Sequence, residues 1–125
     1  MKKNYFNKIL KNFKNSKKVF YKHHQEIYSY KEAYQNLLKL NNYLYKYRNK
    51  KIILFSDKSL GYYIAVIAIF LSGNTWIQIS PNIPLVKIKK IIKFSNTKLA
   101  IYDESFKNKK IFDLKNLKII SLSKV

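Results

Sequence analysis

Apolar and polar positions alternate along the chain in blocks that predict strands and helices in turn. Apolar runs at 51–56 and 99–102, and an alternating stretch at 75–79, are typical of strands, the continuous runs of strands buried on both faces of a parallel sheet. Between them, 62–71 is apolar nearly all round and 85–95 carries one apolar face, as helices do. The order strand, helix, strand, helix, strand predicts an α/β fold with a mostly parallel sheet and helices on both faces.

The residues before this block predict a hairpin and a capped helix. Two short apolar pieces in Val19–Tyr28 flank a polar centre, which indicates a small β-hairpin. Ser29 followed by Glu32 is a capping box, in which each side chain bonds the other residue's amide. A helix over residues 30–47 is expected behind it, with one apolar face made of Ala33, Leu37, Leu40, Leu44 and Tyr47.

Helix ends and loops have their own signals. Residues 57–59, Asp-Lys-Ser, offer N-caps for the helix at 62–71, and Gly73 is expected to end it. Pro81 and Pro84 frame the loop after the strand at 75–79. Near the end of the chain, Ile111-Phe112 and Leu117–Leu122 supply one or two more strand candidates.

Residues 1–18 are expected to form a basic N-terminal helix or tail, ahead of a domain at 19–125. Its apolar positions fall on one helical face (Phe6, Ile9, Leu10, Phe13). Such a helix lies on a membrane surface or packs on the domain, and the pattern allows both. No signal peptide is visible, and the apolar segment at 62–71 is shorter than the roughly 20 residues that span a bilayer. A cytoplasmic location is expected.

The formal charge of +20 raises the question of an anionic partner. Of 26 basic residues only Arg48 is an arginine, although arginine is favoured for bidentate readout of bases and phosphates, and the lysines spread along the whole chain. One interpretation is a solvated lysine surface produced by compositional drift; the other is a free-standing basic α/β module that binds nucleic acid or another polyanion.

The 125 residues suit one domain. Because the chain has no cysteine, a thiol nucleophile, a disulfide and a zinc–thiolate site are excluded.

Candidate chemical groups are few. The chain has two glycines and neither GxGxxG, GxxxxGK[ST] nor GxSxG, so no phosphate loop or nucleophile elbow is present. Asp57 and Asp103 follow successive predicted strands, where they would hold Mg²⁺ or serve as helix cap and solubilising charge. His23 and His24 are expected to point to opposite faces of a strand, which prevents them from sharing a metal.

A further set of charges lies on the helix predicted at 85–95. Its lysines are expected to form a solvated helix face rather than a phosphate site (Lys87, Lys89, Lys90, Lys93). No catalytic, cofactor-binding or metal-binding residue is therefore assigned from the sequence.

Two segments, YSYKEA at residues 28–33 and AIFLSGNTWIQISPNIP at residues 68–84, resemble core motifs of a known family. These are the adenylate-forming (AMP-binding) enzymes, which include acyl-CoA synthetases, peptide-synthetase adenylation domains and D-alanine–carrier protein ligases. Residues 28–33, YSYKEA, are similar to the first motif, with Ala33 in place of the usual Leu. Residues 68–84, AIFLSGNTWIQISPNIP, are similar to the second, which keeps its glycine, its aromatic residue and two prolines (Gly73, Trp76, Pro81, Pro84). The usual Lys, Pro and Asp are replaced (Leu71, Gln78, Ser80).

The resemblance covers residues 17–103 and implies an incomplete N-terminal subdomain of an adenylation domain. The complete enzyme activates a carboxylate with ATP and Mg²⁺ and passes the acyl-adenylate to a thiol of CoA or a carrier protein. Trp76 and the short spacing favour the amino-acid and carrier-protein branch. The family's phosphate loop, adenine and ribose motifs and C-terminal lysine have no counterpart here, so the resemblance implies a truncated or split ligase that binds no cofactor alone. Its partner would be the remainder of the enzyme, and the exposed sheet predicts poor solubility or oligomers.

Overall fold

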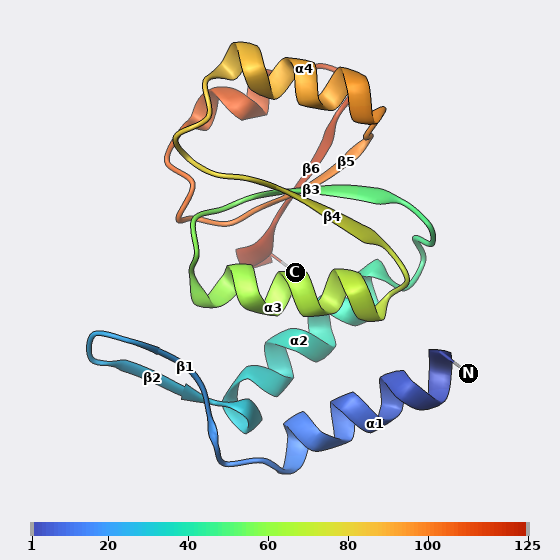
Figure 1. Cartoon of the computed structure of the whole chain (residues 1–125), viewed down its shortest axis with the longest axis vertical. Helices are drawn as coiled ribbons and strands as arrows, with labels where there is room; N and C mark the ends of the chain where they lie inside the picture. Colours follow the sequence, from blue (N-terminus) through green and yellow to red (C-terminus); the bar gives the residue numbers. More distant parts are fainter. Residues whose placement is uncertain (1, 125) are drawn as a thin grey trace.

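The computed structural model describes residues 2–124, with side chains described from residue 7. Two helices and a hairpin of two short strands come first in the chain. A four-stranded sheet follows, with two further helices in the connections between its strands (Figure 1). The elements in chain order are α1 (Lys2–Asn15), β1 (Val19–His23), β2 (Glu26–Ser29), α2 (Tyr30–Leu44), β3 (Lys51–Phe55), α3 (Leu60–Leu71), β4 (Thr75–Ile79), α4 (Leu85–Ser95), β5 (Leu99–Tyr102), the 3₁₀ helix η1 (Lys109–Asp113), β6 (Lys118–Ser121) and the 3₁₀ helix η2 (Leu122–Lys124).

The central sheet confirms the predicted α/β architecture. Its strands run in the order β4-β3-β5-β6, and every neighbouring pair is parallel. The strand β3 is central and pairs with β4 on one side and β5 on the other. Figure 1 shows α4 and η1 covering one face and α3 and α2 lying against the other. All carboxyl ends of the strands therefore meet at one edge of the sheet.

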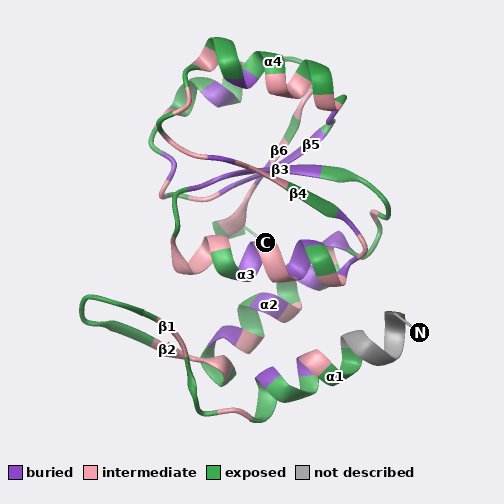
Figure 2. Ribbon diagram, in the orientation of Figure 1, coloured by how far each residue is buried: buried purple, intermediate pink, exposed green. Residues whose placement is uncertain are grey.

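Each face of the sheet carries its own apolar core. Ile52 and Leu54 of β3 pack against α2 and α3, whereas Ile53 and Phe55 face α4 and η1. All four side chains are fully buried, as the continuous apolar run predicted. Figure 2 shows this burial concentrated in the middle strands and in the inner sides of the helices.

The N-terminal helix packs on the domain, which is one of the two alternatives that its pattern allowed. Leu10 and Phe13 of α1 are buried in the core that α2 also lines. The ring of Phe13 meets Phe20 and Tyr30 edge-on, with centroids 5.5 and 4.8 Å apart. The side chain of Phe6 lies outside the described residues. Along residues 2–124, no helix combines the length and apolar character needed to cross a bilayer.

Two predicted elements differ from the structure. The helix expected over 30–47 ends at Leu44, although Tyr47 still packs against the core from the following turn. Ile111-Phe112 is not a strand but part of η1, because the preceding polar loop ends in Asn108, whose side chain accepts from the amide of Lys110 and starts a helical turn. The apolar character of Ile111 reflects burial against the sheet.

Candidate functional site

The carboxyl ends of the parallel strands are where α/β folds bind ligands, and here a serine and an aspartate meet. Ser59 is the N-cap of α3: its hydroxyl accepts from the amide of Tyr62 at 3.1 Å. The same hydroxyl donates to Oδ2 of Asp103, which directly follows β5, at 2.8 Å. Asp103 thus lies against the first turn of α3, where the helix dipole favours a negative charge.

Ser105 completes this polar cluster. Its amide donates to Oδ2 of Asp103 at 3.2 Å, and its hydroxyl makes a short hydrogen bond to the same oxygen. The hydroxyl oxygen also accepts from the amide of Asp57, the residue two positions after β3, at 2.9 Å. One carboxylate therefore ties the ends of β3 and β5 to the start of α3.

Gly61 lets the carboxylate approach the helix this closely. A Cβ placed on Gly61 would lie 3.2 Å from Cγ of Asp103 and 2.8 Å from Cδ2 of Leu122. The sequence marks Gly61 only as a glycine early in a helix. No local pattern indicates that Asp103, just after β5, and Leu122, in η2, fill the space beside it. The close approach depends on tertiary structure.

The capping role considered for Asp57 is wrong, because Ser59 is the N-cap and the Asp57 carboxylate accepts from the adjacent amide of Lys58 at 2.8 Å. The Mg²⁺ alternative also gains no support from the geometry, since one oxygen of Asp103 already accepts from two hydroxyls and an amide. Within the part of the chain that the structure describes, no three His, Cys, Asp or Glu side chains lie together as a metal site would need.

The histidine pair departs from its predicted geometry. Only His23 belongs to a strand; His24 lies in the hairpin turn with a φ of 53°, and the two rings are neighbours with centroids 4.1 Å apart. The expectation that they point to opposite faces is therefore wrong, because the turn rotates the second side chain. Both are exposed, as expected for hairpin residues in solvent.

The lysines predicted on α4 are all exposed, which agrees with a solvated helix face (Lys87, Lys89, Lys90, Lys93). Lys89 and Lys93 additionally line a cavity beside η1, described below. Two apolar side chains lie on the outside of the same helix: Phe94 is 85% and Val86 68% exposed. Trp76 on the edge strand β4 is 39% exposed.

Asn74 is a structural residue that sequence reasoning did not single out. It is 7% exposed, and its amide oxygen accepts from the amide of Lys50 at 3.0 Å. Its amide nitrogen donates to the carbonyl of Tyr47 and to the hydroxyl of Ser72, both at 2.9 Å. The side chain thereby joins the end of α3 to the loop that leads into β3. The signal in the sequence was its place directly after the helix-ending Gly73.

Comparison with known proteins gives structural neighbours only. No family model and no curated protein matches the chain. Among solved structures, the N-terminal subdomain of Klebsiella oxytoca NpsA is 16% identical with a TM-score of 0.75, over 97% of this chain and 31% of that one. VinN, solved in complex with L-aspartate, is 13% identical with a TM-score of 0.76, over 95% and 35%. The nonribosomal peptide synthetase FmoA3 is 12% identical with a TM-score of 0.66, over 79% and 11%.

These likenesses are likenesses of fold. The chain has the architecture found in the N-terminal subdomains of adenylation domains, which confirms the fold that the two sequence motifs implied. It spans about a third or less of the length of the structures it resembles. The motif segments, residues 28–33 and 68–84, provide the capped start of α2 and the α3–β4 connection, both of which are scaffold.

Proposed function

We propose that this chain supplies the first part of the N-terminal subdomain of an ATP-dependent carboxylate-activating ligase and does not carry out the chemistry alone. The observation behind this proposal is the fold match to the NpsA N-terminal subdomain, which includes 97% of this chain but 31% of that structure. The two sequence motifs, at residues 28–33 and 68–84, add independent support because they occur in the family's order. A cytoplasmic setting, where ATP is available, accompanies this proposal.

The family's ATP and Mg²⁺ do not fit the residues present here. Phosphate binding at a strand end needs backbone amides that are free to point at oxygens, which a glycine-rich loop provides. At the ends of β3 and β5 the amides of Asp57 and Ser105 instead donate within the cluster, to Ser105 and Asp103. This region therefore acts as scaffold in the proposal, and the nucleotide site belongs to polypeptide beyond the folded unit described here.

The substrate class favoured by the proposal is an amino acid or a related small carboxylate, delivered to a carrier protein or CoA. Trp76 and the short motif spacing support the amino-acid branch, of which D-alanine–carrier ligases are examples. Two structural neighbours support the same choice through their ligands, L-aspartate in VinN and 3-hydroxyanthranilyl-AMSN in NpsA. Neither ligand carries a long acyl chain.

The partner in this proposal is the remainder of the adenylating enzyme, on the same or a second polypeptide. Two separate exposed apolar regions are available for contact with it: Phe94 and Val86 on the outside of α4, and Trp76 on the edge strand β4. Covering them would remove apolar area from water and complete the sheet edge.

The test is ATP–pyrophosphate exchange with a panel of amino acids. We expect no exchange from this chain alone. Exchange should appear when it is co-purified with the polypeptide encoded directly downstream, provided that this carries a Ser/Thr/Gly-rich loop ending in Lys. Exchange by the chain alone would overturn the scaffold role, and a downstream sequence without such a loop would overturn the ligase assignment.

A further inference from the structure

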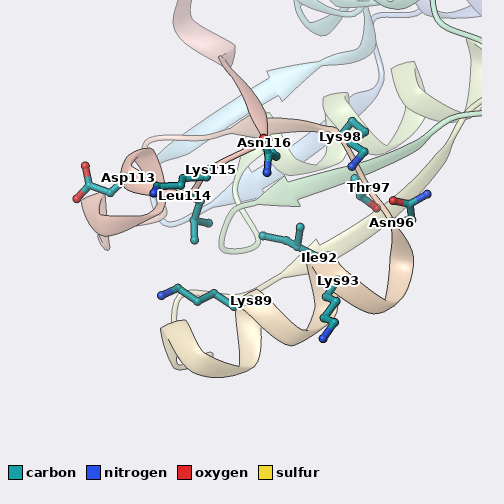
Figure 3. Close-up of a pocket in the computed structure, with 10 residues that line it drawn as sticks. All are labelled: Lys89, Ile92, Lys93, Asn96, Thr97, Lys98, Asp113, Leu114, Lys115 and Asn116. Carbon is teal, nitrogen blue, oxygen red and sulfur yellow. The ribbon is translucent and has the colours of Figure 1, made fainter.

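A basic cavity lies away from the carboxyl edge of the sheet, between α4 and the segment that joins η1 to β6. Its volume is about 500 Å³, within the range of roughly 300–1,000 Å³ typical of small-molecule sites. It opens at the amino ends of β5 and β6, the sheet edge opposite Asp103. Figure 3 shows its lining residues: Lys89, Ile92, Lys93, Asn96, Thr97, Lys98, Asp113, Leu114, Lys115 and Asn116.

The lining combines an apolar floor with cationic arms. In Figure 3, Ile92 from α4 and Leu114 from the opposite segment point toward one another across the cavity. Lys89 and Lys115, from these same two sides, extend in the same direction along the opening, whereas Lys93 points away. A ligand with an apolar or planar part on the floor could thus reach two ammonium groups with an anionic end.

The charge balance of the cavity favours phosphate over a carboxylate or a metal ion. The lining includes four lysines and one acid, Asp113, so its net charge is positive even though Lys93 points away. Ammonium groups on flexible stems suit phosphate oxygens, which they bind as point charges. The side-chain amides of Asn96 and Asn116 add neutral donors and acceptors, and both residues have positive φ values, 53° and 62°, at the two turns that frame the opening.

We propose that this cavity binds a phosphorylated small molecule of about nucleotide size. The apolar floor that Ile92 and Leu114 form distinguishes it from a nucleic-acid surface, which would present its lysines along an open stripe. Its position at the amino end of the sheet separates it from the region where the ligase fold would place its substrate. The inference therefore stands independently of the proposed function.

The probe is ADP without added Mg²⁺, titrated into the whole chain and followed by amide chemical shifts. ADP is not a substrate of the proposed ligase, so this result is separate from the exchange assay. We expect the largest shifts at residues 89–98 and 113–116. Inorganic phosphate should shift a subset of these amides more weakly, and adenosine should bind weakest.

Two charge-matched variants decide the question. Lys89→Glu with Lys115→Glu changes cavity lysines, while Lys87→Glu with Lys90→Glu changes exposed lysines of α4 that are not in the lining. Each pair lowers the formal charge from +20 to +16, because each replacement removes one positive and adds one negative charge. We expect the cavity pair to weaken ADP binding by about tenfold or more, and the control pair by less than about twofold.

If the two pairs weaken ADP binding equally, the proposal is overturned, and the binding is explained by general electrostatic attraction. Shifts spread over lysines of the whole surface would do the same. Single-stranded DNA that binds more tightly than ADP and loses affinity equally in both pairs would establish a polyanion surface instead. Circular dichroism of each variant checks that it is still folded. A third variant, Leu114→Asn, should weaken the binding of ADP more than the binding of inorganic phosphate, because it removes part of the apolar floor.

Discussion

The hydroxyl of Ser59 donates to Oδ2 of Asp103 while it accepts from the amide of Tyr62, so one side chain both starts α3 and fixes the end of β5. Ser59→Ala should therefore cost about 1–3 kcal/mol of unfolding free energy, through the lost cap and an Asp103 oxygen that loses a donor. The measurement is urea denaturation of Ser59→Ala, Asp103→Ala and the double variant. Because the two residues share one hydrogen bond, the double variant should cost less than the sum. Strict additivity would contradict the linkage.

Ser29→Ala should cost about 1 kcal/mol, because it removes the capping box at the start of α2. The hydroxyl accepts from the amide of Glu32 at 3.1 Å, and the Glu32 carboxylate accepts from the amide of Ser29 at 3.3 Å. Thermal unfolding measures the loss. Glu32→Ala should cost less than Ser29→Ala, since the hydroxyl cap remains. An unchanged melting temperature in Ser29→Ala would show that the cap contributes nothing net.

Gly61→Ala should destabilise the fold by about 1–3 kcal/mol although alanine is the better helix former by about 1 kcal/mol. The added methyl would meet the Asp103 carboxylate and the Leu122 side chain. Gly61→Ala should cost less when it is made in the Asp103→Ala variant, because the main obstacle is then absent. Gly73→Ala is the control: its cost comes from a φ of 81° with no atom nearby, so Asp103→Ala should leave it unchanged.

Replacing Phe94 and Val86 together by serine should reduce self-association without lowering the melting temperature. Both side chains are exposed on the outer side of α4 and contribute little to the core, so their apolar area acts mainly between molecules. Light scattering over a concentration series measures the effect. Ile88→Ser on the buried side of the same helix is the contrast and should unfold the protein. A wild-type chain that stays monomeric throughout would contradict the expectation.

The local sequence pattern predicted the helices and strands well. The apolar run of β3 and the helical periodicity of α2 and α4 depend only on residues that are close together in the sequence. The capping box at Ser29 and the helix end at Gly73 were predicted for the same reason. What could not be predicted depends on distant residues: the role of Gly61 follows from Asp103, which directly follows β5, and from Leu122 in η2.

The cavity illustrates the same limit for the candidate sites. Lys89 and Lys93 have the spacing of an exposed helix face, and no residue near them in the sequence indicates that another segment forms the opposite wall of a cavity. That wall comes from residues 113–116, which the chain reaches only after β5 and η1. Likewise, the rings of His23 and His24 came together because a hairpin turn, not a strand, holds the second residue.

Asn74→Ala should cost about 2–3 kcal/mol, more than either cap variant of α2, because it removes a buried side chain and the partners of two part-buried backbone groups. The Asn74 side chain accepts from the amide of Lys50 and donates to the carbonyl of Tyr47, both in the loop before β3. Two backbone hydrogen bonds also hold this loop to the residues after α3: the amide of Asn49 donates to the carbonyl of Gly73 at 3.0 Å, and the amide of Thr75 donates to the carbonyl of Lys50 at 2.9 Å. Urea denaturation measures the loss, and hydrogen exchange should show residues 47–51 opening first. Asn82→Ala, an exposed asparagine in the next loop, is the matched control and should change stability by less than about 0.5 kcal/mol. If both variants are equally stable, the α3–β3 junction is held by packing alone.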